Sequence, residues 1–377
     1  MSRPVVKALW GAAVFLLVVG CASGEGAGGE RTTPSASPPS ASSPAASPPA
    51  APSPQARVTV TGTLTEDLRS PWGVAALADG DLLVSSRDER TVTRVDAGTG
   101  RKTPVGEVPG VVPGGEGGLL GLAVRGGFVY AYFTADSDNR IVRMRYGGGA
   151  TDRLGTPEVI LSGIPKGNVH NGGRIAFGPD GMLYAGTGER GEPDLAQSVE
   201  SLGGKILRMT PEGDPAPGNP FPGSVVYSYG HRNVQGLAWD TERRLWAAEF
   251  GQTTWDELNL VEPGKNYGWP EVEGRGNASG FVNPVAQWRT SEASPSGIAY
   301  ARGAIWMAGL RGERLWRVPL SGAERAGEPE AFLTEEYGRL RTVVAAGEGR
   351  LLLTTSETDT RGTPGPGDDR ILRLDVR

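Results

Sequence analysis

Cysteine is nearly absent from this chain of 377 residues, in which Cys21 is the single one. One cysteine excludes an intramolecular disulfide, so the fold cannot depend on disulfide bonds even if the protein is exported. It also excludes a haem attached through a C-x-x-C-H motif. Histidine is almost as scarce, with only His170 and His231, so the positions of these two side chains carry information.

An excess of basic charge is missing as well. The formal net charge is −5, and removal of residues 1–20, which contain Arg3 and Lys7 and no acid, changes it to −7. An acidic domain without a basic stripe argues against binding to nucleic acid. Apolar periodicity typical of helices is also nearly absent, which favours a fold built from strands.

The N-terminus contains a long apolar run. Arg3 and Lys7 precede the stretch ALWGAAVFLLVV, which ends at Gly20 and Cys21. This pattern predicts a secretory signal over residues 1–20 rather than a membrane span. Because VVGC resembles the lipobox of bacterial lipoproteins, we expect Cys21 to be lipidated. The protein would then be exported and anchored to the outer face of the cell membrane through lipid alone. An ordinary signal with an incidental cysteine is the alternative.

Residues 21–56 are mostly alanine, proline, serine and glycine. Such a segment cannot bury a core and is predicted to remain extended, as a disordered tether. The folded domain is therefore expected at residues 57–377, which is long enough for a sizeable core.

A short sequence theme recurs six times in this domain. Each copy has an apolar strand, a turn with glycine or aspartate, a second apolar strand, a polar loop, and a strand that ends like LRM or WRV. Such repeats predict an all-β, six-bladed β-propeller. The extra strand at residues 57–64 is expected to complete the last blade and close the ring. The copies begin at Gly73, Gly121, Arg174, Gly236, Gly297 and Thr342.

The unusual polar residues occupy equivalent places in the repeats. In a propeller, the loop before each innermost strand and the loop after the second strand open on the same face, because the two strands are antiparallel. Both histidines are therefore predicted to face one mouth of a central channel, although His231 is the less favoured catalytic group and a role in shaping its loop is the alternative. The residues placed at this mouth are Glu116, His170, His231, Arg232, Asn233, Gly251, Gln252, Arg311, Arg339 and Arg341.

Four arginines are expected to converge there. Arg339 and Arg341 are two residues apart and lie on one side of an extended segment, and Arg232 and Arg311 join them. Guanidinium groups bind carboxylates or phosphates through paired hydrogen bonds, so we expect a ligand with several negative charges. Pairing of each arginine with a local acid is the alternative. An imidazole suits a general base near neutral pH, which makes His170 a candidate, with a backbone-bonded loop histidine as the alternative.

Several motifs, in the same order, resemble those of the PQQ-dependent soluble glucose and aldose dehydrogenases, over nearly all of residues 57–377. They are SPWGVAAL, GEGGLLGLAV, HNGGRIAFGPDGMLYAGTGE, NPFPGSVVYSYGHRNVQGLAWD, DELNLVEPGKNYGWPEVEG, SPSGIAY and GRLRTVV. The resemblance implies a six-bladed propeller that oxidises the anomeric carbon of an aldose to a lactone by hydride transfer to pyrroloquinoline quinone (PQQ). With no haem motif, the electrons would leave to an external acceptor such as a quinone, a cytochrome or a dye.

The resemblance also implies a role for each candidate side chain. His170 would act as the general base, with Glu116 beside it and the substrate. Arg232 and Asn233 would contact the quinone oxygens and stabilise the charge that develops there. The cofactor's carboxylates would bind Arg311, Arg339 and Arg341.

Two Ca²⁺ sites are implied by the resemblance. One ion, held by the backbone carbonyls of Gly251 and Gln252, would polarise the cofactor, and a second, structural ion would involve Glu257 and Tyr267. Where the family usually has proline, lysine or aspartate, this chain departs from the pattern, which bears on cofactor affinity and substrate range. The departures are Val234, Gln252, Arg311 and Thr342.

Two other functions remain open at this point. A calcium-dependent lactonase would also use a six-bladed propeller, but it needs a carboxylate-rich metal site, for which the sequence offers Glu116 and Glu189. A propeller at the cell surface that only binds glycan or protein is the other alternative, because propellers host many functions.

Overall fold

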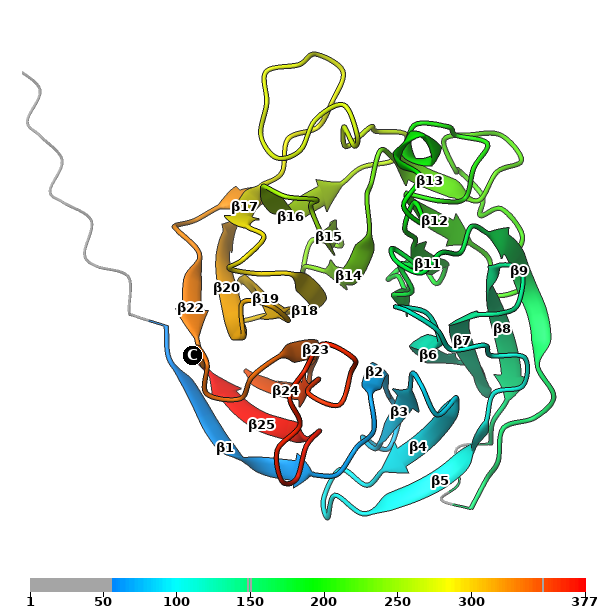
Figure 1. Cartoon of the computed structure of the whole chain (residues 1–377), viewed down its shortest axis with the longest axis vertical. Helices are drawn as coiled ribbons and strands as arrows, with labels where there is room; N and C mark the ends of the chain where they lie inside the picture. The colour runs from blue at the N-terminus through cyan, green and yellow to red at the C-terminus, as the bar shows by residue number, and fades with distance from the viewer. Residues whose placement is uncertain (1–55, 148, 150, 348) are drawn as a thin grey trace, which may run out of the picture. The chain divides into compact units, whose positions relative to one another are not determined.

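The computed structural model describes residues 56–377 apart from 148, 150 and 348. The predicted signal, Cys21 and nearly all of the predicted tether therefore lie outside the described residues. Within them, six small antiparallel sheets surround a central channel (Figure 1). The prediction of an all-β, six-bladed propeller is confirmed.

Helix is scarce in the part of the chain that the structure describes. Its single helical element is a short 3₁₀ helix, η1 (Pro193–Ala196). No helix there is long and apolar enough to cross a membrane.

Each blade has four main strands, numbered outward from the channel. Blades 1, 2 and 3 consist of β2 (Pro71–Ala76), β3 (Leu82–Ser86), β4 (Thr91–Val95) and β5 (Lys102–Glu107); β6 (Leu119–Arg125), β7 (Phe128–Thr134), β8 (Asn139–Arg145) and β9 (Glu158–Ile164); and β10 (Ile175–Phe177), β11 (Leu183–Gly186), β12 (Lys205–Met209) and β13 (Val226–Tyr229). Blades 4 and 5 consist of β14 (Val234–Trp239), β15 (Leu245–Glu249), β16 (Trp255–Val261) and β17 (Ala286–Arg289); and β18 (Pro295–Ala301), β19 (Ala304–Gly309), β20 (Arg314–Ser321) and β22 (Glu330–Phe332), with β21 (Glu324–Arg325) also pairing with β20.

Blade 6 closes the ring by joining the two ends of the domain. Its inner strands are β23 (Leu340–Ala345), β24 (Arg350–Thr355) and β25 (Ile371–Val376), and its outer strand is β1 (Val58–Thr65). β1 pairs antiparallel with β25, with Val58 opposite Val376 and Val60 opposite Leu374. Figure 1 shows β1 lying along β25. The predicted closure is confirmed, and it covers an edge that would otherwise be free to pair with another chain.

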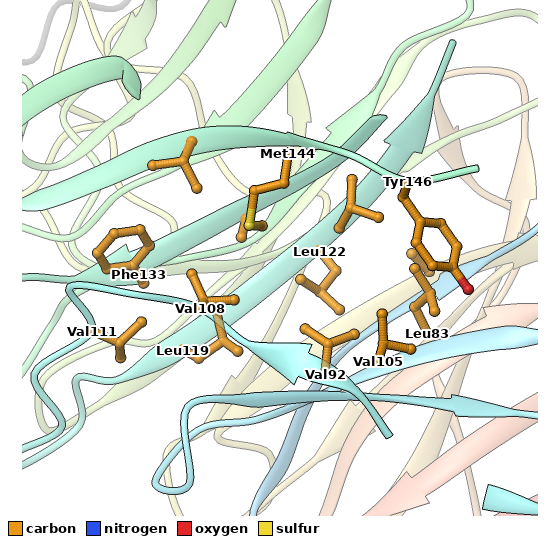
Figure 2. Packing of buried hydrophobic residues seen from close by; sticks show 14 of the residues in the cluster. Leu83, Val92, Val105, Val108, Val111, Leu119, Leu122, Phe133, Met144 and Tyr146 are labelled. Atoms are coloured by element: carbon orange, nitrogen blue, oxygen red, sulfur yellow. The ribbon is translucent and has the colours of Figure 1, made fainter. Parts of the chain in front are cut away.

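Apolar side chains between neighbouring blades hold the ring together. Figure 2 shows the cluster between blades 1 and 2, in which Leu83 and Val92 pack against Leu122, Phe133 and Met144. All five are at most 4 % exposed. Burial of a side chain of this size contributes about 1.5–3 kcal/mol, so each such interface contributes substantially to stability.

The six innermost strands β2, β6, β10, β14, β18 and β23 run through the channel in the same direction. Residues at or just before their N-terminal ends, such as Trp72, Glu116 and Arg341, line a pocket on one face. Residues near their C-terminal ends, such as Ala76 and Val344, line a cavity on the other. We call these openings the upper mouth and the lower mouth. The upper mouth is where the sequence placed the unusual polar residues.

Candidate active site

The upper mouth gathers polar and charged side chains from several blades. Glu116, Asn233, Arg339 and Arg341 all line its pocket, so the structure brings these four candidates together. Trp72 forms part of the same lining and is buried. The lining also includes Arg87, Gln235, Phe250, Leu310, Asp359, Thr360 and Arg361.

His170 is held beside this pocket by two carboxylates. Its Nδ1 lies 2.9 Å from Oε1 of Glu189, a side chain that is 1 % exposed. Since a carboxylate only accepts, Nδ1–H donates, and Nε2 remains as the nitrogen that can take a proton. The backbone N–H of His170 donates to Glu116 Oε2 at 2.9 Å. His170 has a φ of +54°, an uncommon conformation for a non-glycine residue that is enriched at functional sites.

Two glycines allow the loops that carry this pair to approach each other. Gly172 has a φ of +62°, and a Cβ there would lie 2.4 Å from Cα of Thr187. A Cβ at Gly188 would lie 2.1 Å from the carbonyl oxygen of His170. Any larger residue would push these loops apart and would separate His170 from Glu189. The sequence analysis did not predict this pairing, because it considered Glu189 only as a metal ligand. The stretch TGE, directly after the second strand of the blade, could have indicated that Glu189 lies at the upper mouth.

Arg232 is a half-buried cation that forms no ion pair with an acid of the described residues. Its Nη1 lies 3.4 Å from the carbonyl oxygen of Phe250, its guanidinium is 5.4 Å from the centre of the Trp269 ring, and its Nε is buried without a hydrogen-bond partner. No carboxylate of the described chain forms an ion pair with it, and burial lowers its pKa. Next to it, Asn233 Oδ1 accepts the N–H of Gly172. A desolvated guanidinium with an unused donor suits an anionic ligand.

Arg339 and Arg341 share one acid. Nη2 of Arg341 and Nη2 of Arg339 lie 2.9 and 3.2 Å from Asp359 Oδ2, and Arg339 Nε is buried without a partner. Two guanidinium groups against one carboxylate leave a net positive charge, so pairing with local acids accounts for only part of the arginine cluster. Arg311 is exposed and lies with Arg339 in an adjoining cleft of about 620 Å³. Of the four arginines expected to converge, Arg339 and Arg341 line the pocket, Arg311 lines only the adjoining cleft, and Arg232 is in neither lining.

Asp359 is predicted to stabilise the upper mouth in a pH-dependent way. Burial by itself would raise the pKa of Asp359, but the charges of Arg341 and Arg339 outweigh burial and lower this pKa to about 2. A depressed carboxyl pKa contributes stability above the unfolded value near 3.9, and the contribution is lost as the pH falls through about 2. We expect Asp359→Asn to lower the free energy of unfolding by about 3 kcal/mol at pH 7.

Thermal unfolding of the two proteins from pH 7 down to pH 2 would check this expectation. The difference between wild type and Asp359→Asn should be constant above about pH 4 and shrink below it. A difference that stays the same at all pH values would contradict the assignment.

His231 does not face the upper mouth, so the prediction that both histidines do is wrong. Its side chain is fully buried, with Nδ1 2.8 Å from Glu249 Oε1 and Nε2 2.8 Å from Ser228 Oγ, and its ring stacks on Tyr267 at 4.6 Å. Polar partners inside the molecule satisfy both ring nitrogens, which turns the imidazole away from the channel. Glu249 Oε2 also accepts the N–H of Arg232 at 2.8 Å. His231 therefore shapes the loop that presents Arg232. This is the alternative role that the sequence analysis gave for His231.

The loop proposed to hold the first Ca²⁺ follows β15. Oε1 of Glu273 lies 2.7–3.1 Å from the N–H groups of four consecutive residues, from Gln252 to Trp255. These hydrogen bonds hold the loop in place although Gln252 stands where the family commonly has proline. The carbonyl oxygens of Gly251 and Gln252 accept no hydrogen bond from the described residues, so they remain available as oxygen ligands. No group of three or more His, Cys, Asp or Glu side chains in the described residues is arranged to hold a metal.

Glu257 and Tyr267, the candidates for a second Ca²⁺, are not joined by a hydrogen bond in the described structure. The Tyr267 hydroxyl donates to the Leu260 carbonyl at 2.7 Å, so only its backbone oxygen is free for a cation. Burial, together with the charge of Glu249, raises the pKa of Glu257. Asn259 donates to both carboxylates, and its Oδ1 is buried without a partner. This group of oxygens suits a cation.

Two further departures from the family pattern have clear structural consequences. The Val234 N–H donates to the Thr187 carbonyl at 3.3 Å, a bond that proline cannot make. Thr342 Oγ1 donates to the Trp72 carbonyl at 2.7 Å and accepts from Arg174 Nη2 at 3.1 Å. Both substitutions are accommodated by local hydrogen bonds.

Comparisons with known proteins agree with this geometry. The chain resembles the solved PQQ-bound form of aldose sugar dehydrogenase from Streptomyces coelicolor, with 65 % identity, a TM-score of 0.84, and coverage of 87 % of this chain and 100 % of that one. It is 28 % identical over 334 residues to an aldose sugar dehydrogenase of Escherichia coli, covering 78 % of this chain and 89 % of that protein. It is 29 % identical over 282 residues to quinoprotein glucose dehydrogenase B of Acinetobacter calcoaceticus, covering 64 % of this chain and 59 % of that protein. Residues 68–364 match the sequence model of the glucose/sorbosone dehydrogenase family, and the chain therefore belongs to that family.

Proposed function

We propose that the protein is a PQQ-dependent aldose dehydrogenase that oxidises the anomeric carbon of a sugar to the lactone at the upper mouth. The observation that carries this proposal is Arg232, a half-buried guanidinium with a buried, unpartnered Nε, placed in the loop next to an imidazole that Glu189 orients. The likeness to a PQQ-bound aldose sugar dehydrogenase at 65 % identity supports it.

The side chains present fit a cofactor with several negative charges. Arg339 and Arg341 carry more positive charge than Asp359 neutralises, and Arg339 and Arg232 each keep a buried, unused Nε. These arginines would hold the carboxylates and the quinone oxygens, with Arg311 reaching the cofactor from the adjoining cleft. When bound, PQQ would supply the two-electron acceptor for the reaction.

The protein's own contribution is proton transfer and orientation. His170, held through Nδ1 by Glu189, would take the proton of the anomeric hydroxyl at Nε2 while the hydride leaves the anomeric carbon and the carbonyl of the lactone forms. Arg232 and Asn233 would stabilise the negative charge that develops on the acceptor. Glu116, already bonded to the backbone of His170, would lie beside the sugar. The electrons would then pass to an external acceptor.

Calcium would assist at the loop after β15. The carbonyl oxygens of Gly251 and Gln252 would hold one Ca²⁺, which would act as a Lewis acid towards the bound cofactor. A second ion would have a structural role near Glu257, where buried oxygens gather.

The identity of the product tests the proposed reaction. An aldose should be converted to its aldonolactone with reduction of a dye, and the matched methyl glycoside, whose anomeric oxygen has no proton, should be inert. Oxidation of the methyl glycoside at a comparable rate would place the reaction at another carbon and would contradict the proposal.

We also propose that the protein is exported and held at the outer face of the membrane through a lipid on Cys21, with residues 21–56 as a tether. Cys21→Ser should move the protein from the membrane fraction to the soluble exported fraction, because no acyl chain remains to hold it. Activity per milligram should be unchanged. Equal amounts of wild type and variant in the soluble fraction would contradict lipidation.

A further inference from the structure

The lower mouth opens into a cavity of about 510 Å³ at the end of the channel opposite the candidate active site. All six innermost strands contribute to its walls, which are mainly aliphatic, with aromatic side chains among them. The aliphatic residues of the lining that remain partly exposed include Val74, Val124 and Val344, whereas Leu122, Ile175, Leu237, Ile298 and Val343 are buried between the blades. The aromatic residues are Phe177, Trp239 and Tyr300.

A single cation, Arg174, lines this cavity in the described structure. Arg174 is 8 % exposed, and it donates through Nε to the Gln235 carbonyl at 2.8 Å and through Nη2 to Thr342 Oγ1 at 3.1 Å. Both acceptors are neutral, and no carboxylate of the described residues forms an ion pair with Arg174. Its Nη1 has no hydrogen-bond partner in the described chain.

Arg174 remains charged although it is buried. Burial, with the charge of Arg341, lowers the pKa of Arg174 to about 9, so the guanidinium is still protonated at neutral pH. One face of the guanidinium stacks on the Trp72 ring at 4.5 Å. Trp72 lines the upper pocket, so this stack separates the two ends of the channel. A buried charge of this kind is costly without a counter-charge, and an anion entering from the lower mouth would provide one.

We propose that the lower mouth binds a carboxylate that carries a short aliphatic chain. The carboxylate meets Arg174 at the closed end of the cavity, and the chain lies against the aliphatic walls. A charge-assisted hydrogen bond supplies the specificity for the anion. Each methylene that leaves water strengthens binding by roughly fourfold, so the walls select a chain over a small anion.

Calorimetric titration of the purified, cofactor-free protein tests this site with three probes. Octanoate should bind, acetate should bind at least 10-fold more weakly because it lacks the chain, and octanol at least 10-fold more weakly because it lacks the charge. Acetate or octanol binding as tightly as octanoate would overturn the proposal, as would the absence of octanoate binding. The test needs no PQQ, so its outcome is independent of the proposed dehydrogenase activity.

Two substitutions place the site at Arg174. Arg174→Met removes the charge, and Thr342→Asp supplies an internal carboxylate next to it; each should weaken octanoate binding by roughly 10- to 100-fold. Thr342→Ser keeps the hydroxyl and should bind octanoate as the wild type does. Circular dichroism and thermal unfolding establish that each variant is folded. Unchanged octanoate affinity in folded Arg174→Met or folded Thr342→Asp would contradict the assignment.

Discussion

Replacement of His170 by alanine should lower kcat for aldose oxidation by roughly 10³-fold, because the proton of the anomeric hydroxyl then has no positioned acceptor. The side chain is small and lies at the upper mouth, so the fold and the affinity for PQQ should change little. Steady-state dye reduction at saturating aldose, with PQQ binding measured separately, gives the two quantities.

Glu189→Gln provides the matched control for this prediction. Glutamine retains a hydrogen-bond acceptor for His170 Nδ1 but removes the negative charge that stabilises the protonated ring, so kcat should fall by roughly 10- to 100-fold, less than in His170→Ala. Activity of His170→Ala within a factor of about ten of the wild type would show that another group is the base, since a positioned base contributes at least about 10²-fold.

Arg232→Met should separate stability from cofactor binding. Methionine fills much of the same space without the half-buried charge, so the free energy of unfolding of the cofactor-free protein should stay the same or rise by about 1 kcal/mol. Affinity for PQQ should fall by roughly 100-fold, because truncation of one partner of a buried charged contact costs about 2–5 kcal/mol. Chemical denaturation and titration with PQQ measure the two effects.

Arg125→Met is a suitable comparison for Arg232→Met. Arg125 also stacks on an aromatic ring, 5.2 Å from the centre of Phe177, but it lies at the exposed end of β6, away from the upper pocket. Its replacement should leave PQQ affinity unchanged. Equal losses of affinity in both variants would mean that Arg232 has no specific role in binding the cofactor.

The repeat pattern carried most of the information about the fold. Six copies of a hairpin theme predicted six blades, and the extra strand before the first copy predicted the closure now seen between β1 and β25. Both follow from local periodicity and from the need to cover sheet edges, which a sequence records directly. The start of each copy indicated the end of the innermost strands at which Glu116, Asn233, Arg339 and Arg341 line one pocket.

Side-chain partners were harder to predict because they depend on loops that meet in space. Glu189 is 19 residues from His170, and the pair forms only because Gly172 and Gly188 let their loops approach. The orientation of His231 was missed for a similar reason. Its polar partners, Ser228 and Glu249, lie on strands β13 and β15, and nothing in the linear pattern indicates that they satisfy both ring nitrogens.

The partners of the arginine cluster were equally hard to predict from the sequence. The spacing of Arg339 and Arg341 correctly predicted that they point to one side, since both contact the same oxygen of Asp359. Asp359 itself lies in the loop between β24 and β25, and no motif in the sequence indicated that it contacts them. Its charge determines how much of the cluster remains for a ligand.

Reconstitution tests the central claim most directly. The purified, cofactor-free protein is titrated with PQQ in the presence of Ca²⁺ and an aldose, and dye reduction is followed. The account predicts no activity without PQQ, and a rate that rises with PQQ and saturates at one cofactor per chain. Folded protein that shows no aldose-dependent dye reduction at saturating PQQ would contradict the assignment of the upper mouth as a quinone-dependent sugar dehydrogenase site.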